Sequence, residues 1–116
     1  MKVVNLTPHE LTIVSEGKVV LAIPASGSLA RCAQQTKLGN PIEVDGVRVS
    51  TGYNVFGEVN GLPAPQEGTV YFVSALVAQA AWAAGRTDVV CPLSAVRDDA
   101  GRIIGTSGFA SRPVTE

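Results

Sequence analysis

The chain has 116 residues, of which 46% are apolar and 16% are charged, and nine Lys or Arg against ten Asp or Glu give a formal net charge of −1. This length and composition predict a single folded domain over residues 1–116, exclude a disordered chain, and require neither a metal nor a disulfide for folding. The balanced charge, without any run of one sign, excludes the electrostatic footprint of a protein that binds duplex nucleic acid or an anionic membrane.

The N-terminal segment lacks the features of a secretory signal. The apolar run that such a signal needs is interrupted by Asn5, Thr7, Pro8 and His9. The most apolar stretch, residues 70–84, is shorter than the roughly 20 residues of a membrane span. Cys32 and Cys91 lie far apart without metal-ligand spacing, which predicts two buried free thiols in a reducing compartment. We therefore expect a cytoplasmic protein.

Three β-hairpins are predicted from short β-branched runs that flank turn residues. In chain order, they join residues 11–14 to 19–23, residues 42–44 to 47–49, and residues 95–97 to 102–104. Hairpins of this kind are typical of a fold that is rich in antiparallel strands.

The second hairpin has the clearest register. Its Asp-Gly pair at residues 45–46 predicts a two-residue type I′ turn. This turn places Val44 opposite Val47 and Ile42 opposite Val49 on one face, while Glu43 faces Arg48 on the other. The hairpin is therefore expected to have one apolar face and one ion-paired face.

One helix is predicted over residues 75–84. Ser74 is a favourable N-cap, and Gly85 stands where a left-handed C-cap residue is usual. The helix follows a predicted strand at residues 69–73, and residues 86–92 are predicted to return as a strand. Only Gln79 is polar in the helix interior, so we expect a sheet to cover one side and a loop or another subunit to cover the other.

These elements predict an α+β fold that is mostly β. We expect a twisted antiparallel sheet or small barrel, with several hairpins and one buried central helix at about residues 75–84. An almost entirely apolar helix in a chain with so few charges also predicts a homo-oligomer.

The common catalytic and cofactor-binding motifs are absent from the sequence. It contains no Walker A, dinucleotide-binding, zinc-protease, serine-hydrolase or EF-hand motif. One histidine and no thiolate pair cannot form a Cys- or His-rich zinc site within one chain. We therefore expect no metal and no cofactor, and we assign no catalytic residue.

Two segments are candidate anion-binding sites. In the first, Asn5, Thr7 and His9 are expected at a strand end, where they either bind a ligand or hold the turn by hydrogen bonds to the backbone. In the second, Ser26 lies in a glycine-containing turn that precedes Arg31, and this turn is either an anion-binding nest or an ordinary turn.

The helix start and two charged pairs complete the set of candidate ligand-binding residues. Ser74 lies at a helix N-terminus, where free N–H groups favour an anion, although capping alone also explains a serine there. Arg86 and Arg97 are close in sequence to Asp88 and Asp98. These pairs either brace the sheet or place arginines around a phosphate or carboxylate ligand. Sequence alone leaves both alternatives open.

Several of these segments together resemble a known family. They are Asn5 to His9, residues 23–27 with 30–31, residues 61–65, residues 71–74 with 77–78, residues 86–88 with Pro92, and residues 96–98 with Gly101. As a set, they resemble a family of short phage, prophage and actinobacterial proteins that begin with an NLTPH-type motif. The resemblance spans nearly the whole chain and implies a phage or mobile-element setting in a bacterial cytoplasm. It transfers no activity and no catalytic residue.

Three functions follow as hypotheses. The first is a phage-type protein that binds small ligands, such as an oligomeric sponge that sequesters an anionic nucleotide-derived signal and so counters host defence. The alternative is a structural or interaction protein, either a virion component or a direct inhibitor of a host protein. The third is a metal-free phosphoesterase with His9 as base and Ser74 or Asp98 as partner.

Overall fold

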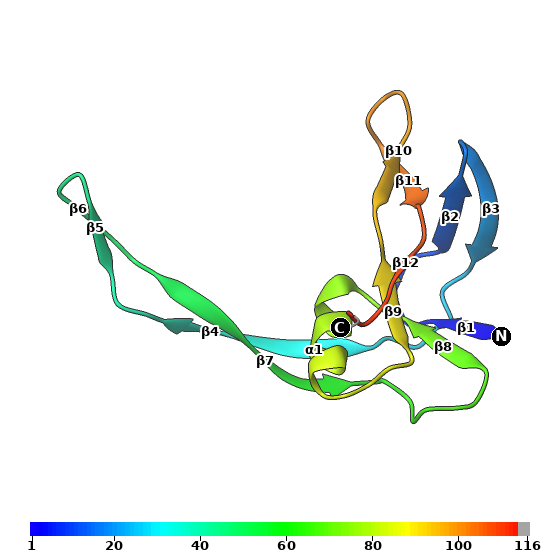
Figure 1. Cartoon of the computed structure of the whole chain (residues 1–116), viewed down its shortest axis with the longest axis horizontal. Coiled ribbons are helices and arrows are strands. Elements are labelled where there is room, and N and C mark those ends of the chain that lie inside the picture. Colours follow the sequence, from blue (N-terminus) through cyan, green and yellow to red (C-terminus); the bar gives the residue numbers. More distant parts are fainter. Residues whose placement is uncertain (114–116) are drawn as a thin grey trace.

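The computed structural model of the protein describes residues 1–113, which form a mostly β structure with one helix, as predicted (Figure 1). The elements are β1 (Lys2–Asn5), β2 (Leu11–Ser15), β3 (Lys18–Ile23), β4 (Arg31–Leu38), β5 (Ile42–Val44), β6 (Val47–Val49), β7 (Gly52–Asn60), β8 (Thr69–Phe72), α1 (Ala75–Ala83), β9 (Val89–Pro92), β10 (Ala95–Arg97), β11 (Ile103–Thr106) and β12 (Phe109–Ala110).

The central sheet has the order β1-β8-β9-β12, and α1 packs against it. Strand β1 pairs with β8 in parallel, β8 pairs with β9 in parallel, and only β12 runs antiparallel to its neighbour β9. The sequence analysis expected an antiparallel sheet, and the parallel pairing in this sheet differs from that expectation. The reason is that hairpin signals report only on strands that a tight turn joins. Here α1 forms the connection between β8 and β9, and a helical crossover brings consecutive strands together in parallel.

The core lies between this sheet and one face of α1. It contains Leu6, Tyr71, Val73, Val77, Ala78, Ala81, Val89 and Cys91, all buried. The helix has the predicted ends: the Ser74 side chain accepts a hydrogen bond from the N–H of Val77, and Gly85 has a φ of 97°. Strands β4 and β7 also contact α1, whereas Leu76 and Gln79 are exposed, so residues 1–113 supply the expected second cover of the helix only in part.

A second sheet, with the order β10-β11-β2-β3, contains the first and third predicted hairpins. Strand β2 pairs antiparallel with β3, β10 pairs antiparallel with β11, and β11 joins the two hairpins in parallel through Thr106 and Ile13. Leu11 and Val14 of β2 are buried, whereas β3 is exposed along most of its length. The second sheet therefore has a largely exposed β3 beside a partly buried β2.

The remaining strands form a long projecting ribbon, here called the arm, which comprises residues 31–60. Strands β4 and β7 pair antiparallel as its shaft, and β5 and β6 form the hairpin at its tip (Figure 1). The tip has the predicted register, and Asp45 and Gly46 have φ values of 51° and 78°, as a type I′ turn requires. The arm gives the molecule a radius of gyration of 17.6 Å, against about 13 Å for a compact domain of this size.

Candidate functional site

The Asn5–His9 segment turns away from β1 at the edge of the central sheet. Asn5 is buried, and its amide donates to the backbone carbonyls of His9 at 2.8 Å and of Ile23 at 3.2 Å. Its side-chain oxygen accepts hydrogen bonds from the backbone N–H and from the hydroxyl of Thr7. All the polar atoms of the Asn5 side chain are thus used in holding the turn, which leaves Thr7 and His9 as the members of this motif that face the surface.

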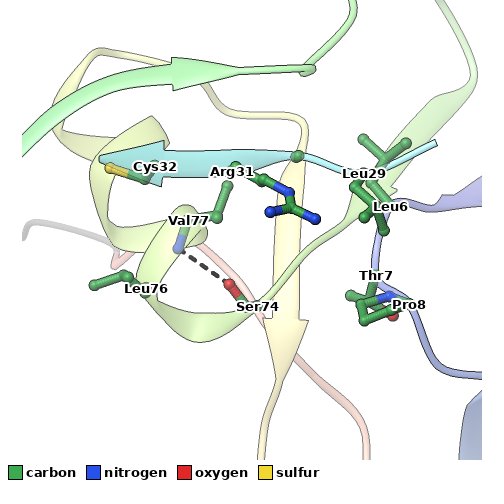
Figure 2. Close-up of a pocket in the computed structure, with 10 residues that line it drawn as sticks. Leu6, Thr7, Pro8, Leu29, Arg31, Cys32, Ser74, Leu76 and Val77 are labelled. Atoms are coloured by element: carbon green, nitrogen blue, oxygen red, sulfur yellow. Dashed lines mark hydrogen bonds between the residues drawn. The ribbon is translucent and has the colours of Figure 1, made fainter. Parts of the chain in front are cut away.

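The same turn forms one wall of a pocket of about 340 Å³. A second wall comes from the segment before β4, which is fixed by a hydrogen bond from the Ala30 N–H to the Leu6 carbonyl. The third wall is the first turn of α1 (Figure 2). The lining residues are Leu6, Thr7, Pro8, Leu29, Ala30, Arg31, Cys32, Ser74, Leu76 and Val77. Three sequence-predicted site residues, Thr7, Arg31 and Ser74, are therefore brought together although they come from three separate segments.

Arg31 is the charged side chain of this pocket. Figure 2 shows its guanidinium extending from the start of β4 into the space between Ser74 and the Leu6–Pro8 turn. Within residues 1–113, no hydrogen-bond acceptor or carboxylate is paired with that guanidinium, and no acidic residue lines the pocket. The N-terminal end of a helix also carries partial positive charge and N–H groups without helical partners. The pocket therefore has a positive polar side and an otherwise apolar lining.

A neighbouring pocket of about 540 Å³ lies between the two sheets. It shares Thr7, Pro8 and Ser74 with the first, and its further polar residues include His9. Apolar side chains such as Phe72 and Ile103 form much of its wall. The two pockets thus lie side by side around the Thr7–Pro8 turn, with Arg31 lining one and His9 lining the other.

Ser26 and the two predicted charged pairs lie outside both pockets. Ser26 accepts a hydrogen bond from the N–H of Ser28 at 3.3 Å, which is an ordinary serine turn. In the third hairpin, Arg97 donates to the carbonyl of Gly101, and Asp98 accepts from the N–H groups of Ala100 and Arg102. These side chains organise local turns, and the arginines do not converge on one cavity.

Arg86 and Asp88 form a bidentate ion pair in the segment between α1 and β9. The Arg86 Nε and Nη2 atoms lie 2.9 and 2.8 Å from the two carboxylate oxygens of Asp88, and Nη2 also donates to the carbonyl of Pro63. Hydrogen bonding to Arg86 lowers the pKa of Asp88, and the same contact raises the pKa of Arg86. The pair joins the loop at Pro63 to the segment that leads into β9. It therefore stabilises the fold, which is one of the two alternatives that the sequence left open for Arg86 and Asp88.

Residues 1–113 bring His9 and Ser74 to the lining of the second pocket, but they supply no cluster of side chains for a metal ion. Residues 1–113 contain no cluster of three or more His, Cys, Asp or Glu side chains that suits a metal ion. The Ser74 oxygen caps α1, and Asp98 lies in the third hairpin away from both pockets. Cys91 is buried, which raises the pKa of its thiol, and Cys32 is half-buried at the pocket edge. Neither cysteine forms a disulfide.

The apolar lining residues were missed by the sequence analysis. Leu6 and Leu29 have no chemistry that marks them as binding residues, and Leu76 belongs to a helix whose residues were all expected to be covered. The one available signal was that Leu6 directly precedes Thr7 and that Leu29 lies two residues before Arg31. Within a single sequence, this proximity does not distinguish a pocket wall from core.

Comparison of the chain with protein-family models, with curated proteins and with solved structures found no match. Within residues 1–113, no helix has the length and apolar character needed to cross a membrane. Any proposal about function therefore rests on the geometry of the molecule and on the sequence motifs.

Proposed function

We propose that the protein is a non-catalytic binding protein for a small anionic molecule that also has an apolar or planar part. The observation that carries the proposal is the position of the unpaired Arg31 guanidinium, which extends toward the N-terminal end of α1 in a pocket without acidic residues. A planar guanidinium fits a phosphate or carboxylate, and the N–H groups at the helix N-terminus also favour an anion.

The apolar walls define the rest of the ligand. Leu6, Leu29 and Leu76 offer surface to a base, a ring or a chain, but no partner for a second charge. At about 340 Å³, the pocket falls within the range of small-molecule sites. A nucleotide-like anion matches this combination. With the resemblance to phage proteins, it supports the hypothesis of a sponge that sequesters a nucleotide-derived signal and counters host defence in the bacterial cytoplasm.

Isothermal titration calorimetry against cyclic dinucleotides and cyclic ADP-ribose isomers tests the proposal. We expect micromolar or tighter binding of at least one compound. Arg31→Gln is expected to weaken it about 10- to 100-fold, as the loss of one charge-assisted hydrogen-bonded contact predicts. Arg48→Gln, in the arm tip, is the matched control and should bind as the wild type does. Absence of binding across the panel, or undiminished binding by Arg31→Gln, contradicts the proposal.

A separate experiment tests whether the protein leaves its ligand chemically unchanged. The bound compound is recovered after long incubation and analysed by mass spectrometry. We expect it intact, because no base is hydrogen-bonded to the Ser74 hydroxyl within residues 1–113. Conversion of the ligand would support the phosphoesterase hypothesis instead.

We also propose that the protein acts as a homo-oligomer.

A structural or interaction role, as a virion component or an inhibitor of a host protein, is the second candidate function. It is supported by the exposure of apolar side chains along the arm, among them Leu38 and Tyr53. Loss of function on changing arm residues, with Arg31→Gln inert, would favour that second role.

A further inference from the structure

The larger pocket, between the two sheets, has no ligand group assigned to it by the proposed function. Its volume is about 540 Å³, against about 340 Å³ for the pocket that Arg31 lines. Thr7, Pro8 and Ser74 line both pockets, so the two cavities meet at the Thr7–Pro8 turn. A single extended molecule that crosses this turn can therefore occupy both.

The charged residues of the two pockets lie close to the same turn. The N–H of Ala30 donates to the Leu6 carbonyl at 3.1 Å, so Arg31 begins beside the residue that precedes Thr7. On the other side, Glu10 follows Thr7 by three residues, a separation of at most about 11 Å in a fully extended chain. The chain bends at residues 7–9, which shortens this distance. Arg31 and Glu10 are thus held within a span that suits a single nucleotide.

The two pockets carry opposite charge. Arg31 is the one charged residue that lines the smaller pocket, and Glu10 is the one acidic residue that lines the larger, which has no Lys or Arg. Within residues 1–113, neither side chain takes part in an ion pair. A guanidinium attracts a phosphate, whereas a carboxylate repels it. An anionic ligand is therefore oriented, with its charge at Arg31 and its uncharged part toward Glu10.

The lining of the larger pocket indicates what this uncharged part is. Leu11, Phe72 and Ile103 are among its apolar residues, and they offer a surface to a flat ring. The Glu10 carboxylate accepts hydrogen bonds from two adjacent N–H donors, and the His9 imidazole can donate one. Guanine presents this set along one edge, with N1–H and N2–H side by side and the O6 acceptor next to them. Adenine has the acceptor N1 on the same edge, which a carboxylate disfavours.

We propose that the two pockets form one site for a guanine nucleotide, with the phosphate at Arg31 and the base in the larger pocket, its N1–H and N2–H directed to Glu10. This inference deepens the proposed function and rests on it. The sugar then lies across the Thr7–Pro8 turn, which both pockets share.

The test is isothermal titration calorimetry with guanosine and adenosine 5′-monophosphates, which differ only in the base. The wild type should bind the guanine nucleotide at least about 10-fold more tightly, as one charge-assisted hydrogen bond predicts. Glu10→Gln should reduce this preference to within about threefold, because an amide also pairs with the amino group and N1 of adenine. Glu43→Gln, in the arm tip, is the matched control and should keep the wild-type preference.

Two further variants separate the ends of the site. Arg31→Gln should weaken both nucleotides by the same factor and leave the preference for guanine unchanged. Ala95→Leu adds bulk at an exposed position in the wall of the larger pocket, and it should weaken the guanine nucleotide at least about 10-fold. The fluorescence of Trp82, whose indole donates to the Val89 carbonyl, reports that each variant is folded.

The outcomes distinguish this inference from the proposed function. If neither nucleotide binds and no compound of the earlier panel binds, both are overturned. Binding that requires Arg31 but shows no preference for guanine, or a preference that survives Glu10→Gln, overturns the inference alone. The same holds if other anions of the panel bind and the guanine nucleotide does not. Undiminished binding by Ala95→Leu would place the base outside the larger pocket and also overturn the inference.

Discussion

The side-chain oxygen of Asn5 accepts hydrogen bonds from the Thr7 hydroxyl at 2.7 Å and from the Thr7 backbone N–H at 3.0 Å. This contact fixes the turn after β1, and through it the position of Pro8 and His9 between the two pockets. The polar residues of the N-terminal motif thus have different roles. Asn5 is buried and stabilises the turn by hydrogen bonds, while Thr7 and His9 line the pockets at the surface.

Replacement of Asn5 by alanine should destabilise the protein by about 2–4 kcal/mol, because the carbonyls of His9 and Ile23 lose the donor that the buried Asn5 amide supplies and Thr7 loses its acceptor. Urea denaturation followed by Trp82 fluorescence measures the loss. Asn40→Ala, at an exposed position in the arm, is the control and should change the free energy of unfolding by less than about 0.5 kcal/mol. Similar values for the two variants would contradict the structural role of Asn5.

The Arg86–Asp88 pair predicts a pH-dependent contribution to stability. The pKa of Asp88 is lower in the folded protein than in the unfolded chain, because Arg86 donates two hydrogen bonds to the carboxylate. The contribution is therefore complete above the unfolded carboxyl pKa of about 4 and is lost as the pH falls through the lower folded pKa.

Asp88→Asn should cost about 1–2 kcal/mol at neutral pH, because Arg86 keeps only a neutral partner and the Pro63 carbonyl. Below about pH 3, the difference between variant and wild type should shrink. Thermal unfolding between pH 2 and 7 checks this, with Asp99→Asn at the third hairpin as the control. A difference that does not change with pH would contradict the assignment.

Gly61 and Gly46 share a positive φ, of 84° and 78°, but differ in their surroundings. A Cβ on Gly61 would collide with the backbone carbonyl of Leu29, whereas one on Gly46 would meet open space. Gly46→Ala should cost about 1 kcal/mol from backbone strain alone. Gly61→Ala should cost several times more, of the order of 3 kcal/mol, because backbone must move. Equal costs in chemical denaturation would contradict the close approach at the base of the arm.

Asp98→Ala tests the third hairpin. Asp98 accepts hydrogen bonds from the N–H groups of Ala100 and Arg102 at 3.0 and 2.9 Å, and its other oxygen pairs with the exposed Arg102 side chain. Its removal should cost about 1 kcal/mol in stability. It should leave the affinity of any ligand that requires Arg31 unchanged. A marked loss of affinity would place the third hairpin in the binding site.

Local features were predictable because they depend on neighbouring residues. The Asp45-Gly46 turn dictates the register of Val44 with Val47, and Ser74 caps the helix that begins next to it. The parallel pairing of β1 with β8 depends on segments that most of the chain separates, and it left no local signal. The tip pattern correctly gave one apolar face, but whether that face is covered depends on contacts that no hairpin motif encodes.

The candidate site was predictable to a similar degree. Thr7, Arg31 and Ser74 were singled out for their chemistry, and the fold brings them to one pocket. Arg86 was singled out for the same reason, but Asp88 lies two residues away, so a short-range ion pair forms instead. Arg31 has no carboxylate beside it in sequence or in the described fold, but that it lines a pocket depends on the tertiary arrangement.

The pairing at the base of the arm has a kinetic consequence. Arg31 pairs with Asn60, so the shaft brings the two ends of the arm together. Hairpins form within about 1–10 μs, whereas the cost of closing a loop grows with its length. Once the arm has zipped, the connection between β1 and β8 behaves as a much shorter loop. We therefore expect early pairing of the shaft to speed folding, and a chain with a weakened shaft should refold more slowly.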